Sequence, residues 1–409
     1  MEVLPFIYLG YMFISLYMLS LFLIIFFRNK DRFFEYPPVT KRYGVSFIVP
    51  AYNEERTIAS TLEYIFEIDY DKIIEVIVIN DKSSDGTLRI ARSLLKKYPR
   101  LKIINNKENL GKAGSLNKAL KIVKGELVAV VDADSYPSSD SLSKMVGYFD
   151  NARVGAVTCP IVARNTDKFI EKLQAIEYKV IAFTRKLLDY VDAIYVTPGP
   201  LALYRKSALL DIKGFDSENM TEDIEATWHL THNGWKRRMC LATTVSSTVP
   251  SKIKDWFVQR RRWNIGGLQC IYKYRHSLGK KEMLGWFIIP FFILSTFLGL
   301  LGLTIFFYLM TRRVISNYLR TLFSIEAGVP ILTINELYIT PSILNYLGVV
   351  LFIAGLIFTL LVLSILKENI LKKENLLNIP FYMMIYLTFY PFIMLNASWH
   401  AIVGKRIWR

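Results

Sequence analysis

Four long segments without a single Asp, Glu, Lys or Arg are the feature that most constrains this chain. Each is longer than the about 20 apolar residues that suffice to span the hydrocarbon core of a bilayer. In keeping with this, 52% of the 409 residues are hydrophobic. The sequence therefore predicts a multi-pass cell-membrane protein whose candidate spans are residues 3–27, 283–311, 337–366 and 375–404.

The first of these segments is predicted to be a retained anchor rather than a cleaved signal peptide. It opens with Met1-Glu2 instead of a basic stretch, and no small-residue cleavage site precedes the basic cluster that follows it. Positively charged residues mark the cytoplasmic side of a span. We therefore expect residues 28–282 to be cytoplasmic, because this part opens with Arg28, Lys30, Arg32, Lys41 and Arg42.

The side of the membrane on which the chain ends stays open. If all three later segments span, the basic tail 404–409 lies outside, against the same rule. Two alternatives avoid this conflict. Either the last segment, which contains Pro380 and Pro391, is re-entrant or interfacial, or the stretch 312–336 crosses the membrane as well.

The cytoplasmic part shows the alternation of strands and helices that is typical of an α/β sheet. Its apolar segments end near residues 50, 80, 104 and 131, close to the roughly 30-residue repeat of a βαβ unit. Such repeats build a mostly parallel sheet. The predicted strands are 46–50, 73–81, 101–104 and 126–132, and the predicted helices between them are 55–66, 85–97 and 113–124.

Acidic side chains follow three of the predicted strands, at the edge where open α/β sheets bind their ligands. Glu54, Asp81, Asp132 and Asp134 are therefore expected to share one rim, which is costly unless a cation or hydrogen-bond donors offset the repulsion. Neither GxGxxG nor GxxxxGK[ST] is present, which disfavours dinucleotide and P-loop sites. Hard carboxylate oxygens suit Mg²⁺ or Mn²⁺, so Asp132 and Asp134 predict a metal that bridges a diphosphate.

The formal net charge of +16 fits nucleic acid, an anionic membrane face or an anionic substrate. Basic residues between 252 and 262 alternate with Trp256 in a pattern that can resemble a nucleic-acid surface. An amphipathic helix on the anionic inner leaflet explains them better, because the apolar segment from Met283 follows closely. We therefore expect membrane lipids, and no nucleic acid, as partners.

Seven short motifs, in this order, resemble the membrane-embedded family 2 glycosyltransferases, which include cellulose, hyaluronan and poly-N-acetylglucosamine synthases. The likeness runs from about residue 46 to residue 267, with apolar segments on both sides. The motifs are YNEE (52–55), VINDKSSDGT (78–87), NLGKAGSLNKAL (109–120), VDADS (131–135), TPGPLALYRKSAL (197–209), TED (221–223) and QRRRW (259–263).

The resemblance implies an α/β fold of the GT-A type, inserted between transmembrane and interfacial helices. The division it implies is an N-terminal transmembrane helix at 1–28, a cytoplasmic GT-A domain at 44–250, an amphipathic interface segment at 251–282 and a C-terminal transmembrane region at 283–409.

The resemblance also implies roles for particular residues. The donor would be a UDP-sugar, and its uridine, diphosphate and metal would be held by Tyr52, Glu54, Asp81, Lys112, Asp132, Asp134, Gln259, Arg262 and Trp263. Asp223 is similar to the general base of the family, with Glu222 beside it as the second catalytic carboxylate. Trp263, Gly199 and Pro200 would border the acceptor sugar.

These roles predict an inverting, metal-dependent transfer of a sugar from a UDP-sugar to a growing polysaccharide or oligosaccharide, coupled to its passage across the membrane. Poly-N-acetylglucosamine or a hyaluronan-like polymer is the favoured product, with UDP-N-acetylglucosamine as the favoured donor. Gly266 and Gly267 resemble the poly-N-acetylglucosamine type, whereas 199–205 resembles hyaluronan synthases, so the identity of the sugar stays open. The alternative is a transferase that adds one sugar to a lipid carrier. A transporter with a regulatory nucleotide domain is disfavoured, because the apolar segments carry few polar residues.

Overall fold

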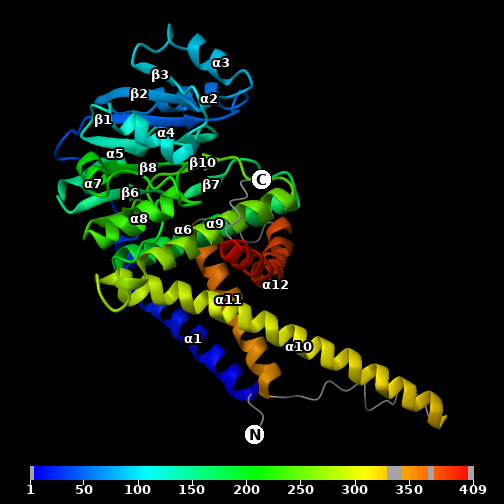
Figure 1. Cartoon of the computed structure of the whole chain (residues 1–409). Helices are drawn as coiled ribbons and strands as arrows, with labels where there is room; N and C mark the ends of the chain where they lie inside the picture. The colour runs from blue at the N-terminus through cyan, green and yellow to red at the C-terminus, as the bar shows by residue number, and fades with distance from the viewer. Residues whose placement is uncertain (1–3, 329–342, 367–372, 404–409) are drawn as a thin grey trace.

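A seven-stranded sheet forms the centre of one half of the molecule in the computed structural model, which describes residues 4–328, 343–366 and 373–403 (Figure 1). Its strand order is β3-β2-β1-β4-β8-β6-β9. All neighbours are parallel except that β8 runs antiparallel to β4 and β6, which confirms the predicted mostly parallel sheet. The strands are β1 (Val45–Ala51), β2 (Ile73–Asn80), β3 (Leu101–Asn105), β4 (Leu127–Val130), β6 (Val154–Thr158), β8 (Ala202–Arg205) and β9 (Lys236–Met239).

Helices cover both faces of this sheet. Successive side chains of a strand point to opposite faces, and apolar side chains stand on both faces here. Phe47 and Val49 pack with Leu62 on one face, whereas Ile48 packs with Leu116 on the other. The first face carries α2 (Ile58–Phe66), α3 (Thr87–Ser93) and α5 (Ser141–Met145), and the second carries α4 (Gly111–Leu120), α7 (Lys206–Asp211) and α8 (Glu222–His232).

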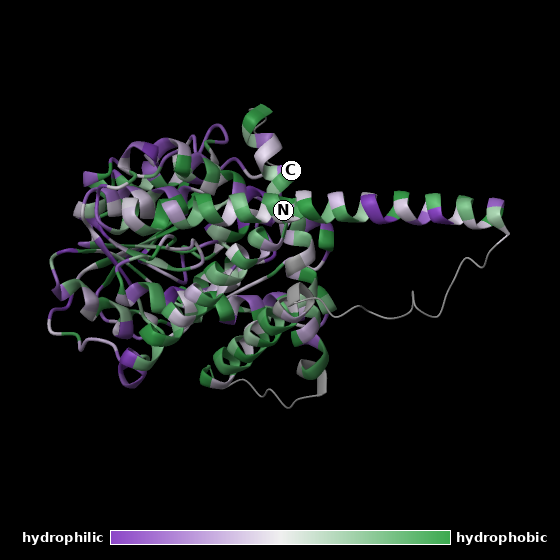
Figure 2. Ribbon diagram, turned by 90° about the horizontal axis from the view of Figure 1, so that it is seen from below, coloured by the Kyte–Doolittle hydropathy of each residue, from purple (hydrophilic) through white to green (hydrophobic). Residues whose placement is uncertain are grey.

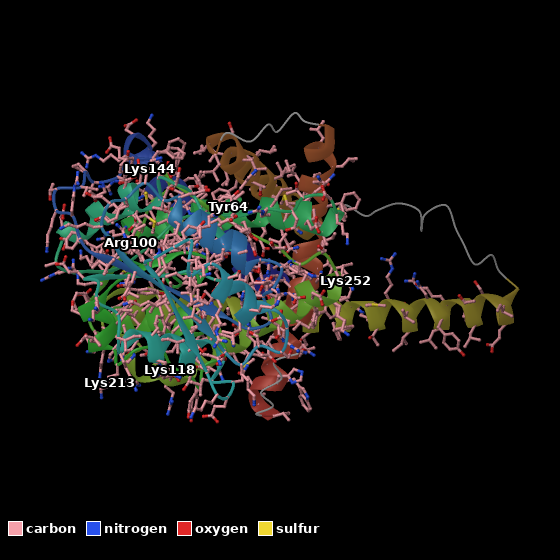
Figure 3. The ribbon with its side chains drawn as sticks, turned by 90° about the horizontal axis from the view of Figure 1, so that it is seen from above. Tyr64, Arg100, Lys118, Lys144, Lys213 and Lys252 are labelled. Carbon is pink, nitrogen blue, oxygen red and sulfur yellow. The ribbon has the colours of Figure 1, made fainter. Side chains whose placement is uncertain are left out.

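A small second sheet connects the rim of the large sheet to two long helices. It has the order β5-β10-β7, and β5 starts directly after Asp134. The chain leaves β7 for α6 and leaves β10 for α9, with Lys252 next to the start of α9 (Figure 3). The elements are β5 (Ser135–Pro137), β7 (Ile161–Ala163), β10 (Val245–Ser247), α6 (Phe169–Tyr190) and α9 (Ile253–Tyr274).

In the part of the chain that the structure describes, four further helices are long and apolar enough to cross a membrane, as the charge-free segments predict. Figure 1 shows α10 extending away from the other helices, and in Figure 2 the ribbon of this extension alternates between apolar and hydrophilic residues. A π-helical turn, Leu284–Ile288, precedes α10. The helices are α1 (Leu4–Asn29), α10 (Ile289–Ala327), α11 (Ile343–Ile365) and α12 (Lys373–Val403).

Both segments named in the two topological alternatives are helical where the structure describes them. Pro380 and Pro391 lie inside one helix, α12, and the chain from Arg312 to Ala327 continues α10. Residues 329–336 and the tail 404–409 lie outside the described residues, so the side on which the chain ends stays open.

Helices α6 and α9 lie between the sheets and the apolar helices. Helix α6 contacts α1, α11 and α12, and α9 contacts α8, α10 and α12. Phe183 of α6 packs with Phe26 of α1 and Val362 of α11 in one cluster. The same two helices thus touch both the half that carries the large sheet and the apolar helices.

Candidate active site

A cavity of about 500 Å³ lies where the carboxyl end of β4 meets α6, α8, α9, α10 and α12. Most of the residues predicted for the site line it, although they come from distant parts of the chain. These residues are Lys112, Asp132, Asp134, Gly199, Pro200, Glu222, Asp223, Gln259, Arg262 and Trp263.

Lys112, near the start of α4, is the cation at the centre of the acidic rim. Its Nζ atom lies 2.6 Å from Oδ1 of Asp132 and 2.8 Å from Oε1 of Glu222. Burial acts to lower the pKa of Lys112, but the carboxylates of Asp132, Glu222 and Asp223 outweigh it and raise this pKa. Burial likewise acts to raise the pKa of Glu222, but Lys112 lowers it, so Glu222 stays ionised. Lys112 thus neutralises part of the carboxylate cluster.

Gly199 allows the loop before β8 to approach this rim. An added Cβ at position 199 would lie against Nζ of Lys112 and 2.8 Å from Oδ2 of Asp132, so this charged pair would have to shift. Glycine therefore favours the close approach of this backbone to the pair. The predicted acceptor loop and the predicted donor rim are brought together here.

Asp134 is the carboxylate of the rim whose protonation is most perturbed. Burial, followed by the charges of Asp132 and Glu54, raises the pKa of Asp134 to about 7. Its Oδ1 atom accepts a hydrogen bond from the Ser135 hydroxyl at 3.2 Å. Such a crowded carboxylate favours a divalent cation as a partner.

The donor set fits a magnesium or manganese ion that is completed by a ligand. The described residues contain no group of three or more His, Cys, Asp or Glu side chains that alone holds a metal. Mg²⁺ is commonly bound by one or two carboxylates, with substrate phosphates and water as the other ligands. Asp132 and Asp134 match this kind of site and do not match a closed structural site.

Asp223 lies in the first turn of α8, whose N-cap position is Thr221, and threonine is a common N-cap residue. The structure shows no side-chain cap there. The Thr221 hydroxyl donates to Oδ1 of Asn219 at 3.2 Å, and no side-chain cap bond is formed at this position. Burial, followed by the charge of Glu222, raises the pKa of Asp223 to about 6. A carboxylate poised in this way suits proton abstraction near neutral pH.

Helix α9 presents Gln259, Arg262, Trp263 and Gly267 to the cavity. Their spacing of three and four residues places them on one face of a helix. Gly266 faces the start of α8 instead, where an added Cβ would collide with the Thr221 hydroxyl. The close packing of these two helices sets the position of Asp223 relative to the QRRRW motif.

Three predicted donor residues lie outside the cavity lining. Tyr52 is exposed, and Glu54 accepts a hydrogen bond from the Thr57 hydroxyl at 2.7 Å. Asp81 is buried, and its Oδ1 atom accepts hydrogen bonds from Nδ2 of Asn106 at 2.8 Å and from the backbone N–H of Leu110 at 2.9 Å. Asp81 thus supports the loop before α4, and its contact with uridine stays a prediction.

Sequence reasoning missed the contribution of α6. Tyr178, Ile181 and Arg185 of this helix line the cavity, and so does Tyr195 beyond its end. The spacing of 178, 181 and 185 is a helical face, but such a pattern is more often a packing face than a site. Only the tertiary arrangement shows that this face meets the acidic rim.

The large sheet, its helices and the rim have the arrangement of the GT-A fold. Residues 46–212 match the family model "Glycosyl transferase family 2", and this part of the chain is therefore a family 2 glycosyltransferase domain.

Curated relatives extend the likeness beyond this domain. The chain is 32% identical over 250 residues to a poly-beta-1,6-N-acetyl-D-glucosamine synthase of Staphylococcus epidermidis, which covers 61% of this chain and 60% of that protein. The enzyme of the same name from Staphylococcus aureus strain COL is 30% identical, with the same coverage. The chain thus matches about three fifths of the length of these relatives.

A solved structure covers nearly the whole chain. It is the mannosyltransferase PcManGT from Pyrobaculum calidifontis in complex with GDP-Man and Mn²⁺, with a TM-score of 0.62, 21% identity and coverage of 98% of this chain and 99% of that one. The likeness confirms the predicted fold.

Proposed function

We propose that this protein transfers a sugar from a UDP-sugar, UDP-N-acetylglucosamine in the first place, to a growing polysaccharide with inversion at the anomeric carbon. One observation carries the proposal. A single cavity joins the charged rim of the family 2 domain to side chains of α10 and α12, two helices that are apolar enough to cross a membrane. The choice of donor and polymer is supported by the names of the curated relatives.

In this proposal Asp223 takes the proton of the acceptor hydroxyl. The freed oxygen attacks the anomeric carbon from the face opposite to UDP, and the bond between this carbon and the β-phosphate oxygen breaks with its electron pair leaving on UDP. Lys112 and Arg262 face the negative charge that develops there. Trp263 offers a flat platform that orients the acceptor ring.

Asp132 and Asp134 would hold Mg²⁺ or Mn²⁺. When bound, such an ion withdraws charge from the diphosphate and makes UDP a better leaving group. Tyr52, Glu54 and Asp81 would bind the uridine from the ends of β1 and β2. Lys112 pairs with Asp132 at 2.6 Å and would orient this carboxylate.

We further propose that the catalytic part, 44–250, is cytoplasmic and that the polymer leaves through the apolar helices. Ser295, Thr296 and Tyr390 give the membrane side of the cavity polar and aromatic surface. Phe291 and Met394 lie there as well and equally suit a lipid, which keeps the single-sugar transfer to a lipid carrier as the second candidate.

Purified full-length protein, incubated singly with each UDP-sugar and Mg²⁺ or Mn²⁺, tests the donor and the product. Mass analysis should show a polymer with UDP-N-acetylglucosamine. A product with one added sugar would select the lipid-carrier candidate. A protein that releases no UDP from any UDP-sugar would contradict the proposal as a whole.

Sealed vesicles with the catalytic part outward test the export. After addition of the donor, the polymer should collect in the lumen, where an added glycoside hydrolase does not reach it. Complete digestion in intact vesicles would contradict passage through the helices, and detergent-opened vesicles serve as the control for hydrolase activity.

A further inference from the structure

Three buried hydroxyl groups lie beneath the predicted acceptor loop, residues 197–200. They belong to Thr197, at the start of this loop, to Tyr204 of β8 and to Thr227 of α8. At most 1% of the surface of each of these residues is exposed. None of them is among the predicted site residues, and the proposed mechanism gives them no role.

The three hydroxyl groups form a row that ends at the proposed base. The hydroxyl oxygen of Tyr204 lies 2.9 Å from Oγ1 of Thr197, and this Oγ1 lies 2.8 Å from Oγ1 of Thr227. Oγ1 of Thr227 in turn lies 2.7 Å from the backbone carbonyl oxygen of Asp223. The backbone N–H of Thr197 also donates to Oγ1 of Thr227, at 2.9 Å.

The direction of each hydrogen bond in this row follows from its last member. A hydroxyl carries one hydrogen, whereas a backbone carbonyl only accepts. Thr227 must therefore donate to Asp223. The hydroxyl of Thr197 then donates to Thr227, and the hydroxyl of Tyr204 donates to Thr197. Oγ1 of Thr227 thus gives its one hydrogen to α8 and accepts two hydrogen bonds from the start of the acceptor loop.

The acceptor loop is stiff enough to transmit the position of Thr197 to the cavity. Proline has a fixed φ, and the residue before a proline is restricted as well. In this loop Thr197 precedes Pro198, and Gly199 precedes Pro200. Pro198, Gly199 and Pro200 line the cavity. A bond that holds Thr197 therefore also holds the wall that is predicted to border the acceptor sugar.

We propose that Thr227 is a positioning residue that sets the distance between the base and the acceptor loop. The inference rests on the proposed function, in which Asp223 takes the proton of the acceptor hydroxyl. One hydroxyl group joins the helical turn that carries Asp223 to the loop beside the acceptor. Without it the loop shifts relative to the base, and the acceptor hydroxyl is less well placed for attack.

Full-length protein in lipid nanodiscs with UDP-N-acetylglucosamine and Mn²⁺ tests this role. Thr227→Val keeps the shape of the side chain and removes the hydroxyl. It should lower kcat about tenfold or more, as a small misplacement of reacting groups does, and leave UDP affinity unchanged. Thr227→Ser keeps the hydroxyl and should retain most of the rate. A parallel loss of UDP affinity in Thr227→Val, or an equal loss of rate in Thr227→Ser, would overturn the proposal.

Thr231→Val is the matched control. Thr231 is buried in the same helix, and its hydroxyl donates the same kind of bond one turn later, to the carbonyl oxygen of Thr227 at 2.7 Å. This variant should lower the unfolding temperature about as much as Thr227→Val but keep the rate. An equal loss of rate in both would show that loosening of α8 is the cause. If Thr227→Val does not fold, Thr197→Val removes the other hydroxyl of the same pair and should lower kcat as well.

Hydrogen exchange without donor keeps the test independent of the proposed function. Peptides that cover the acceptor loop should exchange faster in Thr227→Val than in the wild type, because the N–H of Thr197 loses its acceptor. Thr231→Val should leave this exchange unchanged. If no UDP-sugar is turned over, the proposed function fails, but faster exchange still supports the hold of Thr227 on the loop. Equal exchange in the wild type and in Thr227→Val contradicts that hold, whatever the donor.

Discussion

The guanidinium of Arg260 is fully buried against the carboxylate of Glu177, with 3.2 Å between Nε and Oε1. Oε2 of Glu177 also accepts a hydrogen bond from the Tyr386 hydroxyl at 2.7 Å. Arg260 lies 4.1 Å from the centroid of the Trp263 ring and donates to Gln259. The ion pair thus joins α6 to α9, and the hydrogen bond from Tyr386 adds α12. This junction lies beside Gln259 and Trp263, two predicted site residues.

Arg260→Met should destabilise the protein by about 3–5 kcal/mol, because it leaves Glu177 as an unpaired buried charge. The measurement is the midpoint of thermal unfolding in detergent. Removing both charges, in Arg260→Met with Glu177→Leu, should recover part of the loss. Arg261→Met, one residue further along the motif and half-buried, is the control. An equal effect of both single variants would show that the ion pair does not stabilise the fold.

Gly266→Ala should lower activity by about tenfold or more, because the added methyl group meets Thr221 and displaces the start of α8 with Asp223. Gly267→Ala is the matched control in the same helix. Its Cβ would lie 3.6 Å from Cε1 of Phe292, which is ordinary contact. The rate of UDP release measures both variants. Equal activity of the two would show that the packing of α9 on α8 does not position Asp223.

Asp134→Asn should abolish sugar transfer, because the metal loses a ligand and the diphosphate loses compensating charge. Binding of UDP in the presence of Mn²⁺ should weaken as well, and isothermal titration calorimetry measures it. EDTA should inactivate the wild type, and added Mn²⁺ should restore it. A variant that keeps near-normal turnover in EDTA-treated buffer would exclude the metal role of Asp134.

Asp223→Asn should reduce kcat by roughly a hundredfold or more, the usual contribution of a general base, and leave UDP affinity unchanged. If UDP affinity and rate fall together, Asp223 supports the structure instead.

The dependence of wild-type activity on pH should follow the protonation of Asp223. A base acts in its deprotonated form, and the pKa of Asp223 is raised to about 6. Activity is therefore present above this pH and lost below it, with kcat/KM falling about tenfold per pH unit at saturating metal. The residual rate of Asp223→Asn should not show this fall. A wild-type profile that stays flat down to pH 5 would contradict the base role.

The positions of the rim residues were predictable from the sequence because they depend on local patterns. The strand before Asp132 is a continuous apolar run, and the sheet topology then brings its end to the other strand ends. Asp223 was predictable only by resemblance, since its local pattern equally favours a cap.

The other features of the site depend on contacts between segments that are distant in the sequence. Glu177 lies 83 residues from Arg260 and 209 residues from Tyr386, its two hydrogen-bond partners. No spacing in the chain indicates that these side chains meet. Arg185 resembles any arginine of an amphipathic helix until α10 is placed beside Tyr195. The burial of Asp81 is likewise set by Asn106, on another strand end.

Helices α6 and α9 contact α12 and also line the cavity. A fragment that ends at Ser277 retains the large sheet but lacks Phe291, Phe292 and Ser295, and it exposes the apolar side of α9 to water. Excising the half that carries the large sheet would therefore open the cavity toward α10 and α12. In the proposed function, the reaction cavity is complete only when the apolar helices are present, so the full-length protein in a bilayer or a mimic of it is the unit to assay.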